Sequence, residues 1–203
     1  MSKSFLDKVY EVQGDAAKRA LYDDWAGGYD DDVMGAGYAT PRRIAEALAR
    51  HLPDRAAPVL DFGCGTGLSG AALAQQGFRQ IDGCDPSTGM LDEARAKGVY
   101  DTLWTITEGA PLDPPRAYRA IAACGVISRG AAPPETFDVI TPLVPPGGLI
   151  VVSYNSHTFE DPDYMGKIDA VLGSGFSRLE AEEGPHLPDK GLTSRVFVLR
   201  RDG

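Results

Sequence analysis

A glycine-rich loop framed by two aspartates is the pattern in this sequence most suggestive of chemistry. Asp61 closes a short apolar run and precedes Gly63-Cys64-Gly65-Thr66-Gly67, and Asp85 lies 20 residues beyond Gly65. Glycines at the end of a strand let the chain turn sharply and let backbone groups approach a ligand closely. A carboxylate at the end of the next strand can accept hydrogen bonds from both hydroxyls of a ribose. The spacing therefore predicts a site for a nucleoside-containing cofactor.

Two cofactors fit this pattern. Gly65-Thr66-Gly67-Leu68-Ser69-Gly70 matches G-x-G-x-x-G, the dinucleotide fingerprint, so a nicotinamide oxidoreductase is one alternative. Three observations favour S-adenosylmethionine. Asp61 suits a cofactor that carries an ammonium group and would repel a pyrophosphate, the glycines begin at Gly63, and Asp85 is followed by a helix start that offers Met90 to an adenine.

Three segments in the right order resemble the motifs of class I methyltransferases. Residues 59–67 resemble motif I, residues 85–91 resemble the segment after the second strand, and Pro145-Pro146-Gly147-Gly148-Leu149 resembles the turn before the fifth strand. The segment from Tyr22 to Asp30 resembles the one that closes over the cofactor in the methyltransferase-like proteins of the Williams–Beuren group. The resemblance implies an S-adenosylmethionine-dependent methyltransferase.

The resemblance also implies how the methionine and ribose portions are held. Backbone groups of Gly63, Cys64 and Gly65 would line the methionine portion. Asp61 would support the ammonium group, and Asp85 would hold the ribose hydroxyls.

The adenine would lie between the segments after the second and third strands. Pro86, Ser87 and Met90 would border it. Glu108 would accept a hydrogen bond from the adenine amino group, and the N–H of Gly109 would donate to the ring.

The remaining implied contacts surround the sulfonium. Cys124, at the end of the fourth strand, would face it. Tyr22, Trp25 and Tyr29 would form a lid whose ring faces exclude water and favour a cation. Packing of a cap helix on the core is the alternative interpretation of these three aromatic residues.

The acceptor side carries no fixed catalytic constellation. Methyl transfer from a sulfonium needs alignment more than acid–base groups, because the donor is already activated. His157 and Arg129 are the candidates, as a general base and as a partner for an acceptor carboxylate. An exposed histidine and a surface arginine are the competing interpretations, and a protein that binds the cofactor without turnover is a second possible function.

Alternating strands and helices position these residues. Strands are expected at residues 59–62, 80–84, 103–107, 117–124, 149–153, 176–180 and 194–199, with helices at 68–76, 88–97, 134–143 and 161–172. A further helix starts at Thr40, the expected N-cap, with Pro41 after it. The pattern predicts an α/β fold with a Rossmann-like, mostly parallel sheet of seven strands, the last antiparallel, and helices on both faces.

Residues 1–39 are expected to form an N-terminal helical cap or lid on a core of residues 40–203, the whole being one domain. Within the cap, residues 22–38 are rich in glycine, aspartate and aromatic residues, which predicts a loop or broken helix. The run Asp30-Asp31-Asp32 is interpreted as a solvated turn.

Composition narrows the partners. The net charge of −9 disfavours nucleic acid, and no apolar stretch reaches the roughly 20 residues of a membrane span. Three cysteines without paired spacing indicate a reducing compartment, so a cytoplasmic location is expected, and they come from different strands without a C-x-x-C, so no metal is expected. A chain of 203 residues has little room for a substrate domain, which favours a small-molecule acceptor and a monomer or homodimer.

Overall fold

One sheet of seven strands organises the computed structural model, which describes residue 12 and residues 14–203. Its strands are β1 (Val59–Phe62), β2 (Ile81–Asp85), β3 (Thr102–Thr105), β4 (Ala120–Ala123), β5 (Leu149–Asn155), β6 (Phe176–Leu187) and β7 (Leu192–Arg201). They are arranged in the order β3-β2-β1-β4-β5-β7-β6, and β7 pairs antiparallel with both of its neighbours while the other pairs are parallel. The predicted mostly parallel sheet with an antiparallel last strand is confirmed.

Both faces of the sheet are buried, because successive side chains of a strand point to opposite faces. In β5, Ile150 and Val152 belong to one hydrophobic cluster, while Leu149 and Val151 belong to the other. β4 and the first half of β5 are accordingly continuous apolar runs, as is typical of parallel strands covered on both faces.

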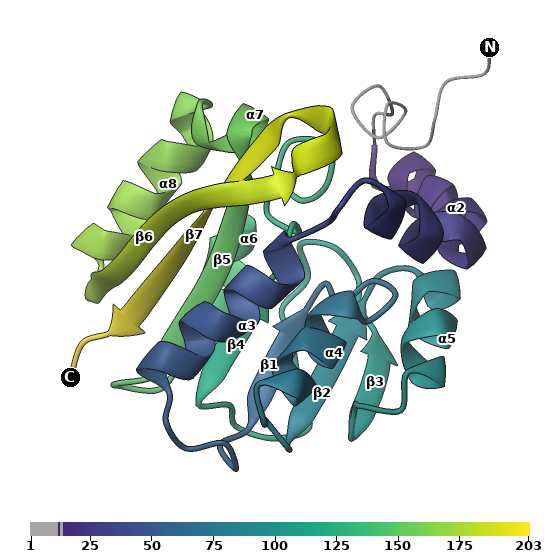
Figure 1. Cartoon of the computed structure of the whole chain (residues 1–203). Coiled ribbons are helices and arrows are strands. Elements are labelled where there is room, and N and C mark those ends of the chain that lie inside the picture. The colour runs from purple at the N-terminus through teal and green to yellow at the C-terminus, as the bar shows by residue number, and fades with distance from the viewer. Residues whose placement is uncertain (1–11, 13) are drawn as a thin grey trace.

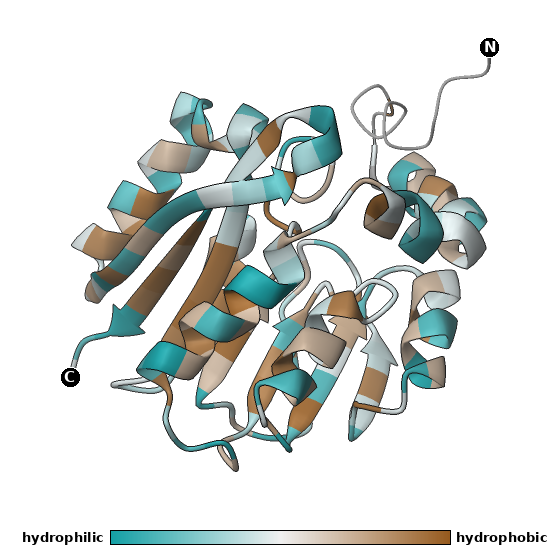
Figure 2. Ribbon diagram, in the orientation of Figure 1, coloured by the Kyte–Doolittle hydropathy of each residue, from teal (hydrophilic) through white to brown (hydrophobic). Residues whose placement is uncertain are grey.

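Helices cover the two faces (Figure 1). α3 (Thr40–His51) and α4 (Leu68–Gln75) contribute to one cluster, and α6 (Thr136–Ile140) and α8 (Pro162–Gly173) contribute to the other. α5 (Thr88–Ala96) contacts β2 and β3, and short turns complete the described chain at α7 (Ser156–Phe159), η1 (Thr141–Leu143) and η2 (Pro188–Lys190). Figure 2 shows teal and brown segments alternating along α3, in front of a brown stretch of β5. The predicted helices on both faces are confirmed.

The start of α3 differs from the expectation in one residue. Ala39, not Thr40, is the N-cap, and Thr40 is the first helical residue. The Thr40 hydroxyl is fully buried and bonds to β6 and β7 instead of capping the helix. Pro41 lies in the first turn as predicted, where its missing N–H costs nothing.

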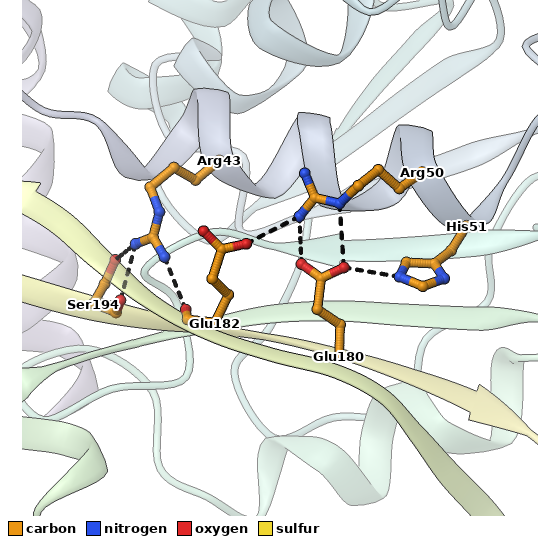
Figure 3. A network of polar contacts seen from close by, with 6 residues as sticks. All are labelled: Arg43, Arg50, His51, Glu180, Glu182 and Ser194. Atoms are coloured by element: carbon orange, nitrogen blue, oxygen red, sulfur yellow. Dashed lines mark hydrogen bonds and ion pairs between the residues drawn. The ribbon is translucent and has the colours of Figure 1, made fainter.

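Ionic contacts fix α3 to the β6–β7 hairpin (Figure 3). Arg50 pairs with Glu180, and His51 Nε2 lies 2.9 Å from Glu180 Oε2. Nearer the start of the helix, Arg43 Nη1 donates to the Ser194 hydroxyl over 2.8 Å. The hairpin is thereby held against the same helix along much of its length.

The N-terminal region contains the long helix α2 (Asp15–Gly35), and the predicted cap at residues 1–11 and 13 lies outside the described residues. The prediction of a loop or broken helix from residue 22 is wrong as far as Gly35. Trp25 and Val33 are each only 2% exposed, and their burial outweighs the low helix propensity of Gly27 and Gly28. α2 packs on α5 and lies beyond the arrowheads of β1, β2 and β3 (Figure 1).

Candidate functional site

The glycine-rich loop joins β1 to α4 in a conformation that requires glycine. Gly63 and Gly65 have φ values of 66° and 53°, and a Cβ on Gly63 would overlap the side chain of Val126. The N–H groups of Gly63 and Cys64 both donate to the carbonyl oxygen of Cys84, over 2.8 and 3.0 Å. These N–H groups are therefore used to join the loop to β2, and a ligand here would meet other backbone atoms.

Asp85 ends β2 beside this loop. Its Oδ2 accepts from the N–H of Gly65 and its Oδ1 from the N–H of Ser87, both over 2.9 Å. A carboxylate can accept about four hydrogen bonds, so about two remain for a ligand. Burial raises the pKa of Asp85 to about 6, because the charged form loses hydration, although the two N–H groups oppose this. Ser87 also caps α5 by accepting from the N–H of Met90 over 3.0 Å.

A cavity of about 560 Å³, hereafter the large cavity, lies between the loop, α2 and the segments that follow β3 and β4. Its volume is in the usual range for sites that bind cofactors. Most of the predicted cofactor-binding residues line it: Tyr22, Tyr29, Gly63, Gly65, Asp85, Pro86, Ser87, Met90, Glu108, Gly109 and Cys124.

Asp61 does not line the large cavity but lies behind the loop, fully buried. Its Oδ2 accepts from the hydroxyls of Ser69 and Tyr100, each over 2.7 Å, whereas Oδ1 has no hydrogen-bond partner among the described residues. Burial raises the pKa of Asp61 to about 6, and the two hydroxyls oppose that rise. Tyr100 reaches Asp61 through space that a Cβ on Gly70 would fill.

Trp25 and Cys64 are also absent from the lining of the large cavity. Trp25 packs edge-on against Tyr29, with ring centroids 4.6 Å apart, and its Nε1–H donates to Asp32 over 2.8 Å. The Cys64 side chain is buried, which raises the pKa of its thiol. Of the three predicted lid aromatics, Tyr22 and Tyr29 border the large cavity, whereas Trp25 packs against Tyr29 and lines the smaller cavity described below.

Acidic residues attach α2 to the cofactor-side loops. Asp30 accepts from the Thr66 hydroxyl over 2.5 Å and from Lys97 Nζ over 2.6 Å. About two turns earlier in α2, Asp23 accepts from the Ser87 hydroxyl over 2.5 Å. The interpretation of Asp30-Asp31-Asp32 as a solvated turn is therefore wrong in two respects. The three residues are helical, and Asp30 is not simply solvated, because it joins α2 to the glycine-rich loop and to the end of α5.

A second cavity of about 80 Å³, hereafter the small cavity, adjoins the large one at the ends of β4 and β5. Arg129 lines it and is exposed, with Nε 3.7 Å from Asp161 Oδ2. His157 is exposed on α7 and lines neither cavity. Of the two predicted acceptor-side residues, only Arg129 therefore lies at a cavity.

Further residues complete the small cavity. His186 lies within β6, is 9% exposed, and its Nδ1 lies 2.8 Å from the Thr40 hydroxyl. Tyr38 packs edge-on against His186 and its hydroxyl lies 3.7 Å from Cys124 Sγ. The only sequence signal for this histidine was its apolar neighbour Leu187, which marks a strand continuing inward.

The three cysteines are unpaired, and burial raises the pKa of Cys124 to about 12. Within the described part of the chain, no three side chains of His, Cys, Asp or Glu are arranged to hold a metal ion. None of the helices in that part is both long enough and apolar enough to cross a bilayer.

Comparison with known proteins identifies a family and a near relative. A family model described as a methyltransferase domain matches residues 37–187. Methyltransferase-like protein 27 of Homo sapiens is 35% identical over 161 residues, which cover 77% of this chain. The match covers 65% of that protein, so the chain spans somewhat less than two thirds of this relative's length.

Solved structures share the fold. The 1,6-didemethyltoxoflavin-N1-methyltransferase of Burkholderia thailandensis, solved with 1,6-didemethyltoxoflavin and S-adenosylhomocysteine, has a TM-score of 0.66 at 20% identity and covers 95% of this chain and 94% of its own. The magnesium protoporphyrin IX methyltransferase of Synechocystis PCC 6803, solved with bound SAM, has a TM-score of 0.64 at 18% identity, with coverages of 94% and 100%. At these identities the likeness shows the architecture.

Proposed function

The chain belongs to the class I S-adenosylmethionine-dependent methyltransferases, as its motifs predicted, and on that premise we propose that it methylates a small-molecule acceptor. The observation that carries the proposal is Asp85, a buried carboxylate at the wall of the large cavity with hydrogen-bonding capacity to spare. S-adenosylmethionine supplies a methyl group already activated on a sulfonium, so the residues of the chain have to bind, align and exclude water.

The loop and its carboxylates fit such a cofactor. The N–H groups of Gly63, Cys64 and Gly65 donate within the protein, which favours a ligand portion that donates hydrogen bonds, such as an ammonium. Asp85 would accept from two ribose hydroxyls. Asp61 lies behind the loop with an oxygen that lacks a partner among the described residues, so its support of the ammonium would act from beneath the loop.

The far end of the large cavity suits an adenine. Pro86 and Met90 contribute apolar surface to the cavity, and Glu108 and Gly109 line the same cavity. We propose that Glu108 accepts from the adenine amino group and that the N–H of Gly109 donates to the ring, as the family resemblance implies. Ser87 would border the ring while it caps α5.

Helix α2 supplies the exclusion of water. Tyr22 and Tyr29 project from it to the large cavity, and its carboxylates Asp23 and Asp30 attach it to both loops that would hold the cofactor. Burial raises the pKa of Tyr29 well above its ordinary value, so the phenol stays neutral beside the site. The Tyr29 phenol is thus uncharged where it borders the large cavity, and α2 also contributes Lys18 and Arg19 to the lining of that cavity.

The nicotinamide alternative is disfavoured by the same contacts. A pyrophosphate at a glycine-rich loop is held by backbone N–H groups that point at it. Here the N–H groups of Gly63, Cys64 and Gly65 donate to Cys84 and Asp85, and a second carboxylate lies behind the loop. A dinucleotide would find few donors and two repelling charges.

Titration calorimetry with S-adenosylmethionine, S-adenosylhomocysteine and NAD tests the proposal. We expect the first two to bind and NAD not to bind. Asp85→Ala should weaken S-adenosylhomocysteine by about 1–3 kcal/mol, the usual loss for hydrogen bonds to a charged group. Asp92→Ala is the matched control, because the Asp92 side chain is 74% exposed on α5 and lines neither cavity.

Turnover is then measured as release of S-adenosylhomocysteine against a panel of small acids, alcohols, amines and thiols. Turnover of one acceptor class supports the enzyme. Binding of NAD alone would refute the cofactor assignment, and tight cofactor binding without turnover across the panel would favour the non-catalytic binder.

A further inference from the structure

The small cavity adjoins the place where the methyl group would be presented. It shares Tyr22, Tyr29, Gly125 and Ala131 with the large cavity, and Gly125 directly follows Cys124. One water molecule needs about 10–15 Å³ of such cavity volume, so a cavity of about 80 Å³ has room for on the order of five non-hydrogen atoms. The small cavity therefore has room for the reactive group of an acceptor rather than for a whole molecule.

The described wall of the small cavity carries uncharged polar side chains and one arginine, and no carboxylate. The chain carries 29 Asp and Glu residues, yet none is among the described residues that line this cavity. Its polar wall comes instead from Tyr38, Ser128, Ser153, Asn155 and His186, with Arg129 at an exposed position. In a protein with a net charge of −9, this is a local environment suited to an anion.

A chain of buried hydrogen bonds sets the tautomer of His186. Arg43 Nη1 can only donate, and it donates to the Ser194 hydroxyl over 2.8 Å (Figure 3). The Ser194 and Thr40 hydroxyls are 2.9 Å apart, and the Thr40 hydroxyl is 2.8 Å from His186 Nδ1. Ser194 and Thr40 are fully buried, and a buried hydroxyl hydrogen without an acceptor costs about 1–3 kcal/mol.

The direction of these bonds follows from that cost. Ser194 already accepts from Arg43, so its hydrogen has an acceptor only if it donates to Thr40. Thr40 then donates to His186 Nδ1, which must be the acceptor nitrogen of a neutral ring. The ring proton therefore lies on Nε2, which makes no hydrogen bond to any residue in the described part of the chain.

No group that faces His186 or lines the small cavity is ready to take a proton near neutral pH. Burial, reinforced by Arg43, lowers the pKa of His186 to about 4. Burial raises the pKa of Tyr38, Tyr29 and the adjoining Cys124, so these remain neutral as well. An acceptor bound here would have to arrive without a proton on its reactive atom.

We propose that the small cavity holds the reactive oxygen of a carboxylate acceptor and that the Nε2–H of His186 donates a hydrogen bond to that carboxylate. The inference rests on the proposed function and deepens it by naming the acceptor class. One carboxylate oxygen forms the bond to the methyl carbon, the carbon–sulfur bond breaks with its electron pair left on sulfur, and a methyl ester results. No proton has to be moved, which matches a wall without a base.

The test uses protein loaded with S-adenosylhomocysteine and labelled with ¹⁵N-histidine. Nuclear magnetic resonance should show His186 protonated on Nε2 at neutral pH, with Nδ1 as acceptor. Titration with acetate should shift the Nε2–H signal, and acetate should bind about tenfold more tightly than its neutral isostere acetamide or than ethylammonium, as one hydrogen bond to a charged group allows.

Two variants at position 186 distinguish the loss of the Nε2–H donor from the loss of the contact with Thr40. His186→Gln keeps an N–H near the position of Nε2 and should retain the preference for acetate. His186→Asn keeps a partner for Thr40 but has no group at the position of Nε2, and should lose about tenfold in acetate affinity.

Several results would overturn the inference: a proton on Nδ1, equal binding of acetate and acetamide, or an unchanged affinity in His186→Asn. Calorimetry with S-adenosylhomocysteine is done first. If it fails to bind, the proposed function is wrong and the inference falls with it. If it binds and acetate shows no preference, only the carboxylate inference is wrong.

Discussion

Replacing Asp85 by asparagine should change how the stability of the ligand-free protein depends on pH. The folded-state pKa of Asp85, about 6, lies above its ordinary value of 3.8 because the carboxylate is buried. Between these values the folded protein holds a proton that the unfolded chain has released, so the free energy of unfolding falls as the pH rises. Asparagine has no charge to bury and removes this fall.

The magnitude follows from the two pKa values. Each pKa unit corresponds to about 1.36 kcal/mol, so keeping Asp85 ionised in the folded state costs about 3 kcal/mol once the pH exceeds 7. At pH 4 the folded state is nearly all protonated there and most of this cost disappears. Asparagine brings its own penalty, because its amide faces an N–H of Gly65 or Ser87, but that penalty of about 1–3 kcal/mol does not vary with pH.

Urea denaturation of the wild type and of Asp85→Asn, repeated from pH 4 to pH 7.5, measures the effect. The difference in unfolding free energy should move by about 2–3 kcal/mol in favour of the variant over this range. Asp61 has a similarly raised pKa, but it is present in both proteins and cancels in the comparison. Asp92→Asn, with a side chain 74% exposed, should show no such trend.

A stability difference that stays constant from pH 4 to pH 7.5 would refute the reasoning. It would mean that Asp85 ionises in the folded protein as easily as in water. The same preparations should show weaker binding of S-adenosylhomocysteine to the variant, because asparagine offers one accepting oxygen where the carboxylate offers two.

Two further substitutions test the contacts around the site. Asp30→Asn should speed dissociation of S-adenosylhomocysteine about three- to tenfold in stopped flow, because the half-buried ion pair of Asp30 with Lys97 helps hold α2 over the site. Asp31→Asn is the control, because Asp31 is exposed, and it should leave the rate unchanged. Equal dissociation rates for the two variants would show that Asp30 does not help hold α2 closed. Tyr100→Phe should lower the free energy of unfolding by about 1–3 kcal/mol above pH 6 and by less below it, because the Asp61 carboxylate needs the Tyr100 hydroxyl as a donor only when it is ionised. Urea denaturation measures this, and a loss of stability that does not depend on pH would contradict the reasoning.

The central strands and the cofactor wall could be predicted because their signals are local. Val59–Phe62 is a short apolar run bounded by Pro58 and the glycine loop, and the structure begins and ends β1 at these residues. Ser87 lies after Asp85 as a typical N-cap, and it caps α5. Strand and helix alternation then placed the ends of the strands together.

The lid helix could not be predicted, because what stabilises it is distant in sequence. Asp30 bonds to Thr66 and Lys97, and Asp23 bonds to Ser87, none of which is visible in a local pattern. The same cause hid the length of β6. The strand was expected to end at Glu180, and Glu182 and Glu183 beyond it resemble loop residues until their ion pairs with Arg50 and Arg195 are seen.

That extra length decides the acceptor side. By extending to Leu187, β6 carries His186 into the interior, whereas His157 falls on α7 at the surface.

Some expectations remain predictions from composition and length. These are the cytoplasmic location, the exclusion of nucleic acid, the single domain with its cap at residues 1–39, and the monomeric or homodimeric state.

Gly70 has a meaning for sequence divergence that the dinucleotide fingerprint conceals. It completes the match to G-x-G-x-x-G, yet what its missing side chain admits is the ring of Tyr100 on its way to Asp61. We therefore expect substitutions at positions 70 and 100 to be correlated. Any side chain at position 70 would first require a smaller residue at position 100, and that change would strip the carboxylate at position 61 of a donor. Proteins that keep Asp61, Gly70 and Tyr100 together would conserve the third glycine of the fingerprint because the tyrosine ring needs the space, whether or not they bind a dinucleotide.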